Sequence, residues 1–188
     1  RDLHSFPTRR SSDLLCAEIL AGRFHADGLS YLLPTMATSN AMFARVERWL
    51  RCMTKSGADA TAQDIHLLHG KAALNDDFSE LLRWPGGQVG DGGEEEDRII
   101  AHQWFSGRKR GLLAPFVVGT VDQLLMAALK SKHVHLRHLG LAGKIVIIDE
   151  VHAYDAYMNT YLDRVLDFLG SYNVSVILLS ATLPSSRR

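Results

Sequence analysis

Short apolar runs alternate along this chain with longer amphipathic segments. The runs that predict β-strands cover residues 29–33, 65–68, 116–118, 145–148 and 174–179. Several of them are apolar at every position, which is typical of strands that helices cover on both faces. Because strand and helix patterns alternate, we predict an α/β fold with a parallel sheet and helices on both faces.

The segments between these runs have the periodicity of helices. Apolar residues recur on one helical face within residues 42–53 and 121–129. The clearest stripe comprises Tyr154, Tyr157, Met158, Tyr161, Leu162, Val165, Leu166 and Leu169. We interpret its aromatic residues as core packing and not as a cofactor site.

The composition limits which partners and which cellular location we expect for this chain. Lys and Arg together number 21, as do Asp and Glu, so a nucleic acid would bind a local surface rather than a net positive charge. Cys16 and Cys52 are too few for a disulfide framework or a cysteine metal cage, which favours a reducing cytosol. No apolar run approaches the ~20 residues of a membrane span. We therefore expect a cytoplasmic location and no membrane partner.

Two segments are expected to lie outside the native fold. "HSFPTRRSSDL", residues 4–14, matches residue for residue one reading frame of a common short-read sequencing adapter. A flexible polar N-terminus is the alternative, but we treat residues 1–14 as non-native and residues 15–188 as the domain. The glycine-rich and acidic residues 85–97 are predicted to be a mobile surface loop, with an acidic switch as the alternative.

Two adjacent carboxylates follow one of the predicted strands. In "KIVIIDEVHAYD", Asp149 and Glu150 come directly after an unbroken apolar run, and His152 stands two positions further on. An aspartate at a strand end can hold Mg²⁺, and the next carboxylate can orient or deprotonate water. Carboxylates also stabilise the start of a helix, which is the structural alternative. The histidine favours the catalytic interpretation.

Hydroxyl groups follow another predicted strand. In "LLSATLP", Ser180 and Thr182 would lie where they could bond the carboxylates or His152. The alternative is an ordinary turn closed by Pro184. We favour a functional role because the segment accompanies the carboxylate pair.

Two further segments combine a strand, a threonine-bearing turn and a helix. They are "LLPTMATSNAMF" and "VVGTVDQLL". Thr120 and Gln123 fit a capping box, which would account for them structurally. Helix N-termini also bind phosphates, including those of a nucleic-acid backbone. The spacing alone leaves both interpretations open.

The phosphate-binding loop that Mg²⁺-assisted nucleotide hydrolysis normally needs is missing. Its pattern is G-x-x-x-x-G-K-[ST]. The two Gly-Lys pairs are followed by Ala72 and Ile145, so neither fits. "HVHLRH", residues 133–138, contains no carboxylate, and we interpret it as an exposed helix end or loop rather than as a metal site.

Taken together, these motifs resemble superfamily 2 DExD/H-box helicases. "PTMATSNAMF", "VGTVDQLL", "DEVH" and "SATLP" resemble motifs Ia, Ib, II and III, in the order of that family. "HGKAAL" and the extension "HAYDAYM" narrow the resemblance to the helicase-nuclease that is the signature protein of type I CRISPR–Cas systems. The similarity runs from about Leu15 to the end of the chain.

This resemblance implies part of a first RecA-like domain of the P-loop NTPase class, incomplete at its N-terminus. The intact family member would be an ATP-dependent 3′–5′ translocase on single-stranded DNA, using Mg²⁺. With an HD nuclease domain that holds its own divalent metal, it would degrade foreign DNA after recruitment by an RNA-guided surveillance complex. Another superfamily 2 helicase acting on DNA or RNA, or a non-catalytic nucleic-acid-binding module, are the alternatives.

The resemblance also implies roles for single residues. Asp149 would bind Mg²⁺ with ATP, Glu150 would activate water, and His152, Ser180 and Thr182 would couple hydrolysis to movement. The DNA path would include Pro34, Thr35, Gly119, Thr120 and Asp122. Because the lysine motif is missing, we expect the chain alone not to hydrolyse ATP and to be marginally stable.

Overall fold

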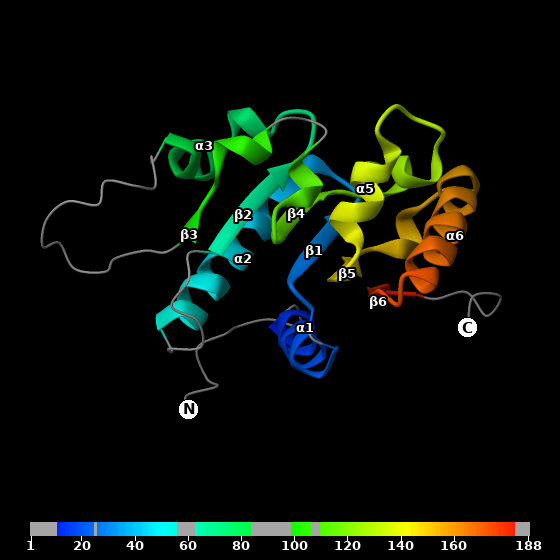
Figure 1. The fold of residues 1–188 in the computed structure, drawn as a ribbon, viewed down its shortest axis with the longest axis horizontal. Helices are drawn as coiled ribbons and strands as arrows, with labels where there is room; N and C mark the ends of the chain where they lie inside the picture. The colour runs from blue at the N-terminus through cyan, green and yellow to red at the C-terminus, as the bar shows by residue number, and fades with distance from the viewer. Residues whose placement is uncertain (1–10, 25, 56–62, 84–98, 107–109, 183–188) are drawn as a thin grey trace, which may run out of the picture.

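The computed structural model describes residues 11–24, 26–55, 63–83, 99–106 and 110–182 (Figure 1). The expected mobile loop at residues 85–97, and residues 1–10, lie outside these ranges. The strands are β1 Gly28–Leu33, β2 Gln63–Leu68, β3 Ile99–Ile100, β4 Phe116–Thr120, β5 Lys144–Ile148 and β6 Ser175–Leu178. The α-helices are α1 Ser11–Phe24, α2 Met36–Lys55, α3 Asp76–Arg83, α4 Val121–Leu125, α5 Val134–Leu141 and α6 Ala156–Ser171. The 3₁₀ turns are η2 Ala72–Leu74, η3 Gln103–Ser106, η4 Gly111–Leu113, η5 Met126–Ala128 and η6 Val151–Ala153.

The strands form one parallel sheet with the order β3-β2-β4-β1-β5-β6. All five predicted strands are present, and the fold class is confirmed as α/β with a parallel sheet. The short strand β3 was not predicted, because its two residues are too few to form a pattern. β1 and β5 are buried at every position, as continuous apolar runs require.

Helices cover both faces of the sheet. One apolar cluster joins residues of α1, α2 and α3 to β1 and β5, including Ala17, Phe43, Phe78 and Ile147. The other cluster lies on the opposite face and joins α4, α5 and α6 to the sheet. Figure 1 shows α5 and α6 beside each other, away from α2. The connections β1–α2–β2 and β5–α6–β6 therefore use opposite faces.

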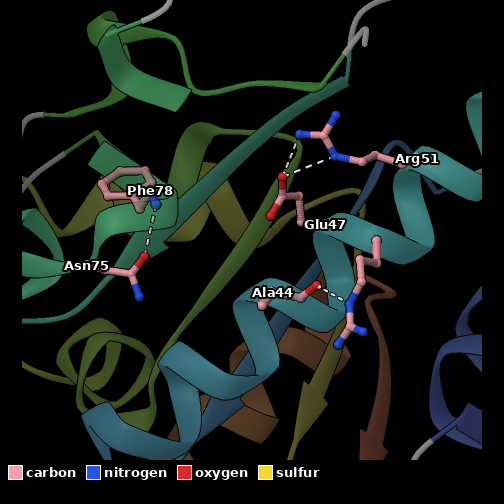
Figure 2. A network of polar contacts seen from close by, with 6 residues as sticks. Ala44, Glu47, Arg51, Asn75 and Phe78 are labelled. Atoms are coloured by element: carbon pink, nitrogen blue, oxygen red, sulfur yellow. Dashed lines mark hydrogen bonds and ion pairs between the residues drawn. The ribbon is translucent and has the colours of Figure 1, made fainter. Parts of the chain in front are cut away.

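Side chains fix where several helices begin. Asn75 Oδ1 accepts the N–H of Phe78 at 2.9 Å and so caps α3, as Figure 2 shows. Asp155 Oδ1 accepts the N–H of Met158 at 2.7 Å at the start of α6. Along the outer side of α2, Arg51 Nη2 pairs with Glu47 Oε1 at 2.7 Å, one helical turn away (Figure 2). The two caps fix the starts of α3 and α6, and the ion pair stabilises the later half of α2.

The predicted helix at residues 121–129 is interrupted. It divides into α4 and η5, and Leu129 is extended. The carbonyl of Ala127 accepts a hydrogen bond from His138 Nε2 at 2.9 Å instead of continuing the helix. Of the two interpretations left open for Thr120 and Gln123, the capping box is wrong: Thr120 makes no side-chain cap bond, and Gln123 Oε1 accepts from Arg137 Nη1 at 3.3 Å.

Two other sequence interpretations need correction. Tyr157, which we expected in the core, is 68% exposed, whereas Leu162, Val165 and Leu169 of the same stripe are buried. Within residues 133–138, His133 is exposed as expected, but His138 lies half-buried inside α5. The periodicity identifies the helix face correctly and overestimates its width.

β6 forms one edge of the sheet and is less covered than the strands beside it. Val176 and Ile177 are half-buried, and Leu178 is 44% exposed. On the face of the sheet that α2 and α3 cover, α1 packs its Leu14 and Ala17 against Ile145 and Ile147 of β5. The apolar strand β6 is therefore the last strand of the described sheet, and α1 lies across β5, the strand beside it.

Candidate active site

Asp149 lies at the carboxyl end of β5 and is only 7% exposed. Its Oδ1 accepts the N–H of Glu150 at 2.8 Å, and its Oδ2 accepts the hydroxyl of Tyr31 at 3.3 Å. Its main-chain N–H donates to Leu32 O, and its carbonyl accepts the hydroxyl of Tyr154 at 2.9 Å. Contacts from β1, β5 and the start of the next segment therefore fix both the backbone and the carboxylate.

Glu150 turns the chain away from the sheet. It adopts the left-handed conformation, with φ 54° and ψ 40°, and directly precedes η6. A non-glycine residue in this region costs about 1–2 kcal/mol, so the surrounding contacts must hold it there. One such contact is the bond from Val151 N to Leu179 O at 3.0 Å. Glu150 is half-buried in this turn, directly after the buried Asp149.

His152 connects the carboxylate pair to the segment after β6. Its Nδ1 accepts the main-chain N–H of Ala181 at 3.3 Å, and Ser180 Oγ lies 3.5 Å from the same nitrogen. Ser180 Oγ also donates to Thr182 O at 2.7 Å. Because Nδ1 accepts a main-chain N–H, the neutral ring carries its proton on Nε2. The structure thus brings the "DEVH" and "SAT" residues together, although the main chain of Ala181 makes the closer contact with the histidine.

Tyr154 was assigned to the core, and it also belongs to this site. Burial raises the pKa of its hydroxyl, and the carboxylates of Asp149, Glu150 and Asp122 raise it further. The phenol therefore stays protonated and remains a donor to the Asp149 carbonyl. Asp122, which is exposed in the first turn of α4, lies close enough to share the electrostatic field of the carboxylate pair.

Asp149 has the free coordination capacity that a magnesium ion needs. A carboxylate offers about four lone-pair positions, and the hydrogen bonds from Tyr31 and from the N–H of Glu150 leave others available. Within the described residues, no group of three His, Cys, Asp or Glu side chains could hold a metal ion. The site therefore fits Mg²⁺ held by one or two carboxylates, water and substrate phosphates, and does not fit an all-protein metal cage.

The other predicted residues lie further along the same edge. Leu33 pairs with Thr120, so the turns after β1 and β4 are neighbours. Thr35 is exposed and caps α2 by accepting the N–H of Thr38 at 3.2 Å, while Pro34 is half-buried. Thr120 is buried, and a side chain at Gly119 would come within 2.5 Å of Leu68 O. Packing therefore gives Gly119 a structural reason for being glycine.

Sequence reasoning missed Tyr31 as a neighbour of Asp149. The contact joins residues 118 positions apart, and a tyrosine within a buried strand gives no local signal of it. A cavity of about 460 Å³ also went unpredicted; it lies between α1, α2 and the amino ends of the strands, with Trp49 and Phe116 in its wall. It is at the opposite end of the sheet from Asp149.

The geometry is that of a helicase domain, and the comparisons agree. The chain belongs to the DEAD/DEAH box helicase family, whose model matches residues 17–188. It is 50% identical over 175 residues to the CRISPR-associated nuclease/helicase Cas3 of Streptococcus thermophilus, covering 93% of this chain and 18% of that protein. It is 43% identical over 162 residues to the endonuclease/helicase Cas3 of Thermus thermophilus, covering 86% of this chain and 17% of that protein. The chain thus spans less than a fifth of either relative.

Solved structures agree in fold as well as sequence. A crystal structure of T. fusca Cas3 matches with a TM-score of 0.81 and 40% identity, over 95% of this chain and 19% of that one. A structure of T. fusca Cas3-ATP matches with a TM-score of 0.77 and 38% identity, over 95% and 18%. A chain of a CRISPR RNA-guided surveillance complex, pre-nicking, matches with a TM-score of 0.62 and 33% identity, over 95% and 15%. The resemblance to CRISPR-associated helicase-nucleases is confirmed.

Across the described residues, none of the helices is both long enough and apolar enough to cross a bilayer.

Proposed function

We propose that this chain is part of the first RecA-like domain of an ATP-dependent 3′–5′ translocase on single-stranded DNA. In the intact parent protein, an HD nuclease domain with its own divalent metal degrades foreign DNA during type I CRISPR interference. An RNA-guided surveillance complex recruits the parent, which works in the cytoplasm. The relatives named nuclease/helicase, and the match to a chain of a surveillance complex, support this function.

The observation that carries the proposal is the contact between His152 and the segment after β6. Asp149 would hold Mg²⁺ with ATP, and Glu150 would orient the attacking water; when bound, the ion would neutralise charge at the phosphates. His152 accepts a bond from Ala181 N, and Ser180 and Thr182 lie on the same turn. A shift at the carboxylates can therefore reach residues 180–182 through the side chain of His152, beside the main-chain bond from Val151 N to Leu179 O. Pro34, Thr35, Gly119, Thr120 and Asp122 line or support the DNA path at the same edge.

The phosphate-binding loop belongs upstream of Leu15 in the parent. α1 and α2 pack on the same face of the sheet. α1 lies across β5 and leads into β1, and α2 connects β1 to β2. A right-handed crossover through α1 would place the preceding strand beside β6, whose outer edge pairs with none of the described strands.

Glu150→Gln in the intact parent tests this function. We expect DNA-stimulated ATP hydrolysis to fall by about 10²–10⁴-fold, while ATP binding persists, because the substitution keeps the side chain's shape. Glu18→Gln, which alters an exposed carboxylate on α1, is the matched control. Retained turnover in the Glu150 variant would contradict the role assigned to this residue. The 188-residue chain alone should show no Mg²⁺- and DNA-stimulated ATPase.

The sequence of the complete parent gene upstream of Leu15 would distinguish the alternatives. A different superfamily 2 helicase, acting on DNA or RNA, would carry the phosphate-binding loop just upstream of Leu15 but no HD domain. A non-catalytic nucleic-acid-binding module would lack both. The buried Asp149, whose carboxylate keeps lone-pair positions free for a metal ion, favours a catalytic protein over a binding module.

A further inference from the structure

The peptide group between Asp149 and Glu150 is held by a hydrogen bond at each of its two ends. Its carbonyl, that of Asp149, accepts the hydroxyl of Tyr154 at 2.9 Å. Its N–H, that of Glu150, donates to Asp149 Oδ1 at 2.8 Å. Because a peptide group is planar, bonds at both ends fix its orientation.

The peptide group on the other side of Glu150 is held in the same way. The carbonyl of Glu150 accepts the N–H of Ala153 at 2.8 Å, and the N–H of Val151 donates to Leu179 O at 3.0 Å. The two peptide planes together determine the φ and ψ angles of Glu150. The point from which the Glu150 side chain leaves the backbone is therefore set by these bonds.

The left-handed conformation of Glu150 needs such support. Its φ of 54° is unfavourable for a residue that carries a Cβ atom. If one of the flanking peptide groups were released, the backbone could rotate toward a more favourable conformation. The Glu150 carboxylate would then move away from its present position.

The Tyr154 bond differs from the others around Glu150 because it comes from a side chain further along the chain. The bonds from Ala153 and Val151 join main-chain groups, and the Asp149 carboxylate belongs to the adjacent residue. The Tyr154 hydroxyl reaches the peptide group from five residues away. Replacing tyrosine by phenylalanine deletes this one bond and keeps the ring.

Tyr154 is itself firmly held. Its side chain is only 6% exposed and packs in the apolar cluster that contains Val151 and Leu162. Its carbonyl accepts Asn159 Nδ2 at 3.1 Å, and the next residue, Asp155, caps α6. The hydroxyl is therefore presented to the Asp149 carbonyl from the start of a packed helix.

We propose that Tyr154 is a positioning residue for Glu150: its hydrogen bond to the Asp149 carbonyl keeps the Glu150 carboxylate where it would orient the attacking water. This inference rests on the proposed function, since it takes Glu150 as the residue that activates water. The hydroxyl acts through the peptide group and not on the phosphates. Its loss should therefore weaken binding of the transition state more than binding of the ground state.

Tyr154→Phe in the intact parent tests this role by steady-state kinetics. The kcat of DNA-stimulated ATP hydrolysis should fall by about 10–100-fold, the loss expected when a catalytic group is displaced by about 1 Å. The KM for ATP should stay unchanged. Tyr157→Phe, which removes an exposed hydroxyl from the same helix, is the matched control and should behave as the wild type. A wild-type kcat in the Tyr154 variant would overturn the proposal.

Binding measurements separate positioning from a general loss of structure. The affinity of the Tyr154 variant for ADP with Mg²⁺ and aluminium fluoride, which mimics the transferring phosphoryl group, should fall by the same factor as kcat. Its affinity for the ATP analogue AMPPNP should be that of the wild type. If both affinities fall equally, Tyr154 only stabilises the fold, and the positioning role is excluded.

A double variant shows whether Tyr154 acts through Glu150. In the Glu150→Gln background, Tyr154→Phe should cause no further loss of ATP hydrolysis, because the group that it positions is already gone. Additive losses would contradict this. The two levels of inference also fail differently. Retained turnover in Glu150→Gln alone would overturn the proposed function, whereas an inactive Glu150→Gln beside a fully active Tyr154→Phe would overturn only the role of Tyr154.

Discussion

The main-chain N–H of Ala181 donates to Nδ1 of His152 at 3.3 Å, joining the residues after β6 to the carboxylate turn after β5. Two main-chain bonds accompany it, from Leu179 N to Ile148 O and from Val151 N to Leu179 O. The backbones of the two turns are therefore already paired. His152 adds the side-chain link, so it can be removed without separating the strands.

His152→Ala should uncouple the two turns in the intact parent. We expect ATP binding to persist and the stimulation of ATP hydrolysis by single-stranded DNA to fall about tenfold or more, because DNA-dependent shifts at residues 180–182 no longer reach Glu150. Steady-state ATPase assays with and without oligonucleotide measure this ratio. Ser180→Ala is the comparison: it keeps the Ala181 N–H, so its loss should be smaller. An undiminished stimulation ratio in the His152 variant would exclude the coupling role.

Tyr154→Phe should lower the free energy of unfolding of the chain by about 1–3 kcal/mol, because it leaves the buried Asp149 carbonyl without its donor. Urea denaturation measures the difference. Tyr157→Phe on the same helix is the matched control, and it should change stability by less than about 0.5 kcal/mol because that side chain is 68% exposed. Equal losses in the two variants would mean that the Asp149 contact is not what stabilises the site.

Acid should destabilise the fold through His66. Burial lowers the pKa of His66 to about 4, and its Nδ1 has no hydrogen-bond partner among the described atoms. An unfolded histidine has a pKa near 6.5, so the unfolded state binds more protons between these values. Stability is therefore complete above pH 6.5 and falls as the pH drops toward 4, by up to about 3 kcal/mol.

A substitution isolates this contribution from that of the carboxylates. His66→Phe keeps a planar ring against Phe78, whose centroid lies 4.9 Å from that of His66. The stability difference between wild type and variant, measured by urea denaturation, should change between pH 6.5 and 4 and be constant above. A constant difference throughout would show that His66 does not titrate in this way.

Raising the pH above 7 should stabilise the fold through Lys144. The first residue of β5 is buried, and its ammonium donates to the carbonyls of Leu112 and Ala114. Burial lowers its pKa to about 7, whereas an unfolded lysine titrates near 10.5. The unfolded state binds the extra proton between these values, so stability should rise from pH 7 to pH 10.5, by at most about 5 kcal/mol. The two carbonyl acceptors stabilise the charged form and reduce this rise.

Lys144→Met removes the titrating group. The rise of stability between pH 7 and 10, followed by urea denaturation, should then be smaller than in the wild type. Identical pH profiles would mean that Lys144 keeps an ordinary pKa despite its burial.

The parts of this fold that follow from local pattern were predictable. Apolar runs identified five strands, and because parallel strands end at one edge, they also indicated that Asp149 and Ser180 would lie near each other. The contact between Tyr31 and Asp149 was not predictable, since the two residues are far apart in sequence. The capping box at Thr120 was wrong for the same reason. Arg137, 14 residues further along the chain, donates to the main-chain and side-chain oxygens of Gln123.

The exposed edge at β6 has a consequence for anyone who handles this chain. Among the described residues, the outer edge of β6 pairs with no strand, and an apolar strand with such an edge is a template for another strand, which a second copy of the chain offers. Expressed alone, the polypeptide should self-associate as its concentration rises, and charged substitution at Leu178, which is 44% exposed, should improve its solubility. The edge where we propose that the parent's preceding strand pairs would therefore promote association of the chain when it is expressed alone.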